Sequence, residues 1–211
     1  MLTVRLVFEK TGRARFTSHL DLMRGMTRAM RRAGVPLWYT EGFNRHPYLT
    51  FAAPLSLGYE GLGETMDLRL AQPTDLSAMV DALNAVLPEG LHIVSAAEAV
   101  AGPGDLAAAS YRLTFDCPAD EVRALLAQPQ ILVEKTNKKN VTRTVDIRPF
   151  FAAAQVTGDD RQAVVDVTLP CGSSENINPA MLLTALDADG GSRHCRVLRT
   201  QLLTADGRPF R

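Results

Sequence analysis

The chain has 211 residues, of which 46% are hydrophobic and 22% charged, and its 23 Lys and Arg balance its 23 Asp and Glu. This composition is typical of a globular protein with a buried core and excludes a low-complexity, disordered chain. No run of 18 apolar residues occurs, and the first residues, MLTVRLVFEK, alternate instead of forming an apolar signal-peptide core, so we expect no membrane association and a cytoplasmic location.

The first half of the chain predicts the element order βαββαβ with one extra segment, which is typical of a ferredoxin-like domain. Alternating apolar and polar residues predict a strand over Thr3–Glu9. Ser18, followed three residues later by Asp21, predicts the start of a helix that continues to about Arg32 and stops at Gly34. The elements expected next are strands near Leu37–Tyr39 and Leu49–Ala53, a strand over 64–72, a helix over 74–90 and a strand over 91–99.

A Gly/Ala-rich linker at 101–109 is expected to separate a first domain, at 1–100, from a second at 110–211. The segments VRLVFE (4–9) and YRLTFD (111–116) share an Arg-Leu-x-Phe-acid frame, which we interpret as an internal repeat. The fold class expected is therefore α+β, with two tandem ferredoxin-like domains and antiparallel sheets. In the second domain, residues 144–158 and 162–170 are expected to form a hairpin around Gly-Asp-Asp.

The zero net charge conceals a segregation of charge along the chain. Residues 1–48 hold nine Lys and Arg against three Asp and Glu, residues 49–134 hold three against twelve, and residues 135–148 hold five against one. Basic residues are thus concentrated in two short regions, where a local positive field can form.

The first basic region contains an amphipathic helix. At about 100° per residue, one of its faces is apolar and the opposite one is basic. The residues expected on the apolar face are Leu20, Leu22, Met23, Met26, Met30 and Ala33. The basic face carries Arg24, Arg28, Arg31 and Arg32. Arginine offers planar, forked donors that match phosphate, so we predict a phosphate-binding face, with an ordinary solvated face as the alternative.

The segment EGFNRHPYLTF follows the helix and predicts a loop. Turn geometry explains its Gly, Asn and Pro, but it does not explain two aromatic side chains, an Arg and a His in the same turn. Aromatic residues beside cations suit stacking on unpaired bases, and a packed loop is the alternative. The candidate nucleotide contacts are Phe43, Asn44, Arg45, His46 and Tyr48.

The second basic region, EKTNKKNVTRTVDIRPF, predicts a basic hairpin. It either extends the phosphate-binding track or forms a solvated hairpin tip. Its cations are Lys135, Lys138, Lys139, Arg143 and Arg148.

Motifs of metal, cofactor and hydrolase sites are missing from the sequence. Cys117, Cys171 and Cys195 have no paired spacing, and there is no Cys triad for an iron–sulfur cluster, no HExxH, no GxSxG and no P-loop. We therefore expect no metal or cofactor in this chain and no enzyme activity of its own. Metal-free RNA cleavage needs only a base, an acid and a positive group, so His19 and His46 remain candidate catalytic residues.

Three segments together resemble the radical-SAM-linked protein family, a bacterial domain found free-standing or fused to B12-binding radical SAM proteins. They are SHLDLMRGMTRAMRRAGVP, EGFNRHPYLTFAAPLSLG and KNVTRTVDIRPF. The family often has Gly-Phe-Asn-Pro at the loop, whereas this chain has Arg45 before His46. The resemblance implies a radical SAM enzyme as partner, which would hold the iron–sulfur cluster, SAM and cobalamin, and it favours RNA as the substrate.

The leading hypothesis is an accessory RNA-binding or substrate-presenting protein that works with a radical SAM enzyme in RNA modification or processing. One alternative is a metal-independent endoribonuclease, which tandem ferredoxin-like domains with a basic helix also resemble in architecture. Another is a domain whose basic faces dock on the radical SAM partner without contact with RNA.

Overall fold

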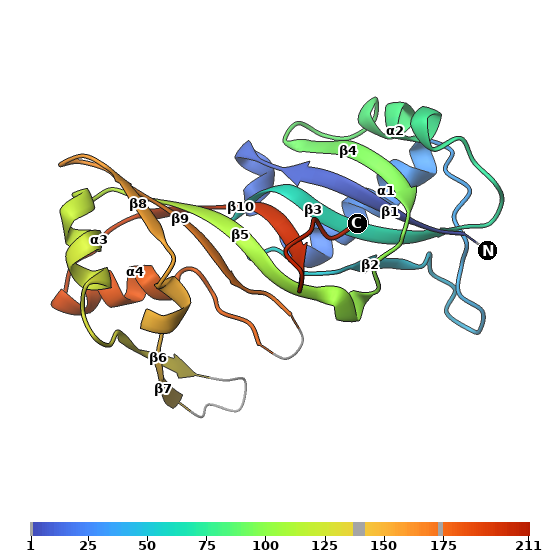
Figure 1. The fold of residues 1–211 in the computed structure, drawn as a ribbon. Helices are drawn as coiled ribbons and strands as arrows, with labels where there is room; N and C mark the ends of the chain where they lie inside the picture. The colour runs from blue at the N-terminus through green and yellow to red at the C-terminus, as the bar shows by residue number, and fades with distance from the viewer. Residues whose placement is uncertain (1, 137–141, 173–174) are drawn as a thin grey trace. The chain divides into compact units, whose positions relative to one another are not determined.

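The computed structural model describes residues 2–136, 142–172 and 175–211 and has an α+β fold with mostly antiparallel strands (Figure 1). The chain divides into two compact units. The first consists of Met1–Leu106 and Arg199–Arg211, and the second of Ala107–Leu198. The last strand, β10 (Cys195–Thr204), therefore begins in the second unit and ends in the first.

The first unit has the predicted element order βαββαβ. Its strands pair in the order β4–β1–β3, β2 also pairs with β3, and these pairings are all antiparallel. Its elements are β1 (Leu2–Lys10), the 3-10 helix η1 (Gly12–Phe16), α1 (His19–Arg32), β2 (Leu49–Phe51), β3 (Glu60–Leu70), α2 (Leu76–Asn84), β4 (Leu91–Glu98) and the 3-10 helix η2 (Pro103–Asp105).

Helix α1 begins and ends where the sequence predicts. The Ser18 hydroxyl accepts a hydrogen bond from the Asp21 amide at 3.2 Å, which satisfies one of the free N–H groups of the first turn. After the last turn, Gly34 takes a positive φ of 71°, which a glycine adopts without strain. Leu20, which was expected on the apolar face, is 50% exposed. Side chains of a helix tilt toward its N-terminus, so this first-turn residue extends past the start of the helix.

The core of the first unit lies between its sheet and its two helices. Alternate residues of β1 and β3 point toward the helices, and α1 and α2 supply the other half of the same apolar cluster. The residues of this core that are at most 1% exposed are Val4, Leu6, Phe8, Met26, Met30, Met66, Leu68, Leu83 and Ile93.

A charged pair is buried at the end of this core. Arg199 forms two hydrogen bonds with the Glu64 carboxylate, one of them at 2.8 Å, and the side chains of both are 4% exposed. Lys10 lies in the same region and donates to the carbonyl of Thr17 at 2.9 Å. Burial lowers the pKa of Lys10, while the charge of Glu64 opposes that shift.

The strand expected near Leu37–Tyr39 is not formed. Leu37 and Tyr39 make only isolated bridges, to Leu70 and to Pro47. Pro47 has no amide hydrogen to donate, so a continuous ladder cannot extend along this pair of segments.

In the second unit, β5, β9 and β8 pair in that order, and the first residues of β10 extend the sheet beside β5. Part of the expected linker at 101–109 forms η2, and its last residues belong to β5. The elements are β5 (Leu106–Phe115), α3 (Ala119–Leu126), β6 (Leu132–Thr136), β7 (Thr142–Asp146), the 3-10 helix η3 (Arg148–Phe151), β8 (Gln155–Gly158), β9 (Ala163–Pro170), α4 (Met181–Leu186) and the 3-10 helix η4 (Asp187–Asp189).

The hairpin expected between 144–158 and 162–170 is only half correct. β8 does pair with β9, but Thr142–Asp146 pairs with β6 in a separate two-stranded sheet. Between β7 and β8 lies η3, in which Pro149 cannot donate to a strand ladder.

The two repeated segments, in β1 and β5, make the same contacts within their own units. Arg5 binds Asp67 across β1 and β3 through Nε and Nη2, each at 2.7 Å. Arg112 binds Asp166 across β5 and β9 through the same two atoms, at 2.8 and 3.0 Å. The Arg of the shared sequence frame is thus a bidentate cross-strand partner of an Asp in both units.

Candidate nucleic-acid interface

The four arginines of α1 lie on the exposed side of the helix. Arg24 is 3.6 Å from Asp21, and both side chains are more than half exposed, so this pair holds the guanidinium only weakly. Arg31 donates from Nε to the hydroxyl of Tyr39 at 3.1 Å. Within the described part of the chain, Arg28 and Arg32 have neither an ion pair nor a hydrogen bond from their side chains.

The spacing of three of these arginines lowers the stability of α1, because it places like charges next to one another. Arg24, Arg28 and Arg32 follow one another at i, i+4, where like charges destabilise a helix by about 0.2–0.5 kcal/mol for each pair. A bound anion would remove that repulsion. Between the first two, Met23 and Thr27 complete a shallow hollow of about 400 Å³ on the helix surface.

The loop after α1 is held at its base and exposed at its tip. The Thr40 amide donates to the carbonyl of His46 at 2.9 Å, and the Tyr48 amide donates to the carbonyl of Trp38 at 3.2 Å. At the tip, Phe43 is fully exposed, with a relative exposure of 110%. An aromatic ring in that position is available to stack on a flat ligand.

His46 has a defined tautomer in this loop. Its Nδ1 is 3.0 Å from the carbonyl oxygen of Asn44, and since a carbonyl only accepts, Nδ1 carries the hydrogen of this bond. In the neutral imidazole, Nε2 is then the acceptor. The ring as a whole is exposed, as are Asn44 and Arg45 beside it.

Arg69 belongs to the same surface, although no pattern in the sequence singles it out. Its guanidinium lies 4.1 Å from the ring centroid of Tyr48 and 5.4 Å from that of Trp38. Stacking between aromatic rings fixes the plane of a guanidinium and leaves its edge free for hydrogen bonds. In the residues that the structure describes, no side-chain hydrogen bond or ion pair occupies that edge. The alternation in β3 marks Arg69 as a polar-face residue, but it gives no sign of aromatic neighbours 21 and 31 positions away.

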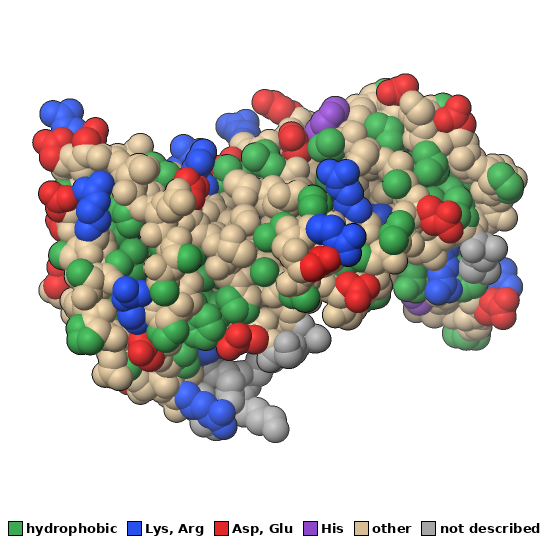
Figure 2. Space-filling model, in the orientation of Figure 1, with side chains coloured by type: hydrophobic (Ala, Val, Ile, Leu, Met, Phe, Trp, Pro, Cys, Tyr) green, Lys and Arg blue, Asp and Glu red, His purple; other side chains and the backbone are tan. Residues whose placement is uncertain are grey.

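Helix and loop form one surface of the first unit because Arg31 contacts Tyr39. The arginine also lies 5.8 Å from the centre of that ring, so the last turn of α1 is held against the base of the loop. In Figure 1, α1 lies behind the sheet, and Figure 2 shows that basic and acidic side chains are interspersed on the side facing the viewer.

The two candidate catalytic histidines flank opposite ends of α1. His19 is the first residue of α1 and packs edge-on against Phe51, with 5.1 Å between ring centroids, yet it remains exposed. His46 follows the other end of the helix. A helix of 14 residues is about 20 Å long, so His19 lies at the opposite end of α1 from the segment that leads to His46.

Part of the basic hairpin predicted in the second unit is described. Lys135 and Arg143 are directly opposite on β6 and β7, and Lys135 donates to the carbonyl of Asn176 at 3.3 Å. The Arg148 amide donates to Asp146 at the start of η3. Lys138 and Lys139 lie outside the described residues.

Two negative findings concern the described residues alone. They contain no group of three or more His, Cys, Asp or Glu side chains that could hold a metal ion. Nor do they include a helix with the length and hydropathy that crossing a bilayer requires.

Comparison with known proteins places the chain in a family. No curated protein matches it. A crystal structure of an unknown protein from Galdieria sulphuraria is similar at 12% identity over 94% of this chain and 98% of that chain, but its TM-score of 0.28 supports no argument. The profile of a bacterial family described as "Uncharacterized protein conserved in bacteria (DUF2344)" matches residues 3–179. This match covers most of the sequence, and the chain belongs to that family.

Proposed function

We propose that this protein binds single-stranded RNA through the arginine side of α1 and the loop beside it, and presents that RNA to a radical SAM enzyme. One observation carries the proposal. Arg28 and Arg32 have no partner in the described part of the chain, and the last turn of their helix contacts the base of the loop that carries a fully exposed Phe43. Unpaired guanidinium groups bind phosphates, and an exposed ring stacks on unpaired bases.

The arrangement suits a single strand better than a duplex. Stacking on Phe43 requires a base whose face is free, and the stacked guanidinium of Arg69 offers its donor edge to a phosphate or a base edge. His46 adds an imidazole acceptor at the same loop. The four arginines of α1 would then follow the backbone that leads away from the bound base.

The remaining parts of the proposal rest on the sequence. The resemblance of three segments to the radical-SAM-linked family suggests the partner enzyme, which would contain the iron–sulfur cluster, SAM and cobalamin. The same reasoning suggests RNA modification or processing as the process and the cytoplasm as the location. The element order and strand pairing support two ferredoxin-like domains, the second with β6 and β7 inserted.

The test is fluorescence anisotropy with a labelled single-stranded 12-nucleotide RNA, the matching DNA and an RNA duplex, each from 50 to 200 mM salt. Contacts with four to six phosphates predict a slope of roughly −3 to −4 in log K against log salt, which is about a 50- to 340-fold loss of affinity over this range. Arg28→Glu/Arg32→Glu should make the slope shallower by about 1.4, since two phosphate contacts are lost.

The control is Arg161→Glu/Arg208→Glu, which changes the net charge equally at two exposed positions elsewhere. Equal weakening by both double variants would mean a general charge effect and no arginine site. Absence of binding at 50 mM salt would favour docking on a protein instead. RNA cleaved in EDTA, with the activity lost in His46→Ala, would favour the endoribonuclease.

A further inference from the structure

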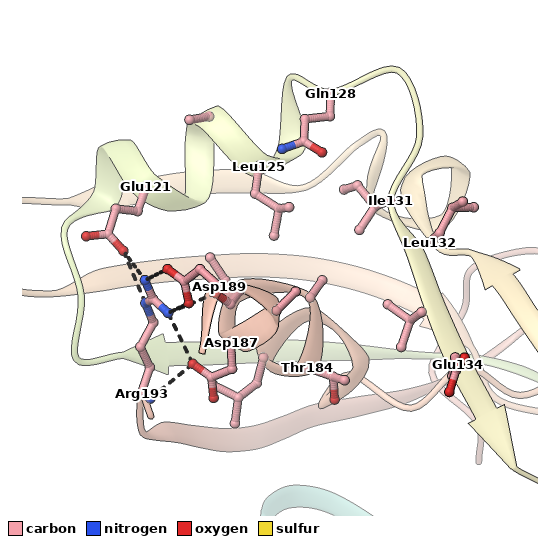
Figure 3. Close-up of a pocket in the computed structure, with 16 residues that line it drawn as sticks. Glu121, Leu125, Gln128, Ile131, Leu132, Glu134, Thr184, Asp187, Asp189 and Arg193 are labelled. Atoms are coloured by element: carbon pink, nitrogen blue, oxygen red, sulfur yellow. Dashed lines mark hydrogen bonds and ion pairs between the residues drawn. The ribbon is translucent and has the colours of Figure 1, made fainter. Parts of the chain in front are cut away.

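The second unit has a large groove between α3, α4 and β6 (Figure 3). Its volume is about 1230 Å³, which exceeds the usual size of a small-molecule site. Apolar side chains from all three elements line it: Leu125, Ile131, Leu132, Val133, Leu183 and Leu186. Leu132 is 60% exposed, which is unusual for a large apolar side chain on a strand.

One end of the groove is acidic. Arg193 contacts three carboxylates: Glu121 at 3.0 Å, Asp189 at 2.8 Å and Asp187 at 3.2 Å. Figure 3 shows these four side chains gathered at the end of the groove away from Leu132. Hydrogen bonds from Arg193 hold the pKa of Asp189 well below its usual range, so it is ionised at neutral pH. One cation among three anions leaves two negative charges in excess.

The ion pairs of Arg193 with Glu121, Asp187 and Asp189 stabilise the second unit, but the three carboxylates carry more negative charge than Arg193 neutralises. Arg193 links α3, through Glu121, to the segment that follows α4, through Asp187 and Asp189. A single carboxylate on each side would make that link. The side chains of Glu121 and Asp189 are 43% and 60% exposed, so both are accessible to a cationic partner.

The opposite end of the groove is close to basic residues. Lys135 follows the lining residue Glu134 on β6 and is held near the start of α4 by its bond to the carbonyl of Asn176. Across the hairpin, Arg143 is its direct neighbour. The groove thus has an acidic end and an apolar middle, and at its far end the lining carboxylate of Glu134 is outnumbered by the two cations beyond it, Lys135 and Arg143.

We propose that this groove binds an amphipathic helix of a partner protein, with its apolar side chains on the Leu-rich walls and its Lys or Arg residues at the Glu121–Asp187–Asp189 end. An apolar stripe that enters a groove between helices is a common mode of peptide recognition. The helix dipole sets the direction: the positive N-terminus lies at the acidic end, and the negative C-terminus lies toward Lys135 and Arg143. This proposal concerns a protein partner and is independent of RNA binding by the first unit.

The experiment uses the full chain and three synthetic 18-residue amphipathic peptides with the same leucine stripe. The first has four lysines in its N-terminal turns, the second has glutamates at those positions, and the third has the four lysines in its C-terminal turns. Titration calorimetry should show the first peptide binding at least tenfold more tightly than the second. It should also bind more tightly than the third, because placing the lysines of the third peptide at the acidic end brings its negative C-terminus to the same end.

Variants of the protein locate the binding. Leu132→Gln and Asp189→Asn should each lower the affinity for the first peptide at least fivefold. Asp120→Asn is the matched control, since it removes the same charge from a 90% exposed side chain on α3 outside the groove lining. Hydrogen exchange on the complex should protect 121–134 and 183–193. The proposal fails if the first peptide does not bind, if all three bind equally, or if Asp120→Asn weakens binding as much as Asp189→Asn.

Discussion

Replacing Glu64 by glutamine tests whether a buried charge pair stabilises the first unit. Glu64 on β3 accepts two hydrogen bonds from Arg199 on β10, and both side chains are only 4% exposed. Arg199 also donates to the carbonyl of Ala53 at 2.6 Å, so it stays in place when its partner changes. Glu64→Gln therefore leaves a buried guanidinium without its counter-charge, and Lys10 close by adds a second cation.

The expected loss in free energy of unfolding is about 3–5 kcal/mol, the range for breaking one partner out of a buried ion pair. With a urea dependence of about 2 kcal/mol per M, the unfolding midpoint should fall by roughly 1.5–2.5 M. Arg24→Gln is the control, since its pair with Asp21 is about 60% exposed at both side chains and should contribute under about 1 kcal/mol.

The assay is equilibrium unfolding in urea followed by the fluorescence of Trp38, the single tryptophan of the chain, which lies in the same unit. The double variant Glu64→Leu/Arg199→Met should lose less stability than Glu64→Gln, because it removes both charges together. If Glu64→Gln lowered stability by no more than Arg24→Gln does, the pair would not be buried in solution and the reasoning would be refuted.

Three further predictions concern single positions. Gly90→Ala should destabilise the protein by more than about 2 kcal/mol, since φ is 84° there and a Cβ would lie 2.4 Å from the carbonyl oxygen of Thr11. Gly34→Ala is the control: φ is also positive there but the space is open, so the loss should be only about 1 kcal/mol. Equal losses in urea unfolding would contradict the clash at Gly90. Ser18→Ala should lose about 0.5–2 kcal/mol through the missing helix cap, and an unchanged midpoint would mean that the cap contributes nothing. Burial raises the pKa of Cys195 from 9.0 to about 12, so the thiol keeps its proton in the folded state after the unfolded chain has lost it. The contribution of the protonated Cys195 thiol to stability is complete below pH 9 and is lost as the pH rises toward 12. The stability of wild type relative to Cys195→Ala should therefore fall between pH 9 and 10.5. A constant difference would refute the raised pKa of Cys195.

Local features of the chain were predictable because they depend on residues close in sequence. Ser18 and Gly34 bound a helix through a side-chain cap and a positive φ, and both act within a few residues. The alternation in β1 requires only that one face of a strand be buried. The shared frame of VRLVFE and YRLTFD marked two strands whose arginines, Arg5 and Arg112, have equivalent Asp partners.

Tertiary structure decided the features that join distant segments. The stack of Arg69 on Tyr48 and Trp38, and the burial of Glu64 with Arg199, join positions tens to more than a hundred residues apart. The sequence therefore predicted part of the candidate interface, namely the residues of α1 and of the loop after it. Apart from Arg69 on β3, its cations lie within one helix and one loop, but the contacts that hold and orient them are long-range, and only the packing of strands and helices creates those contacts.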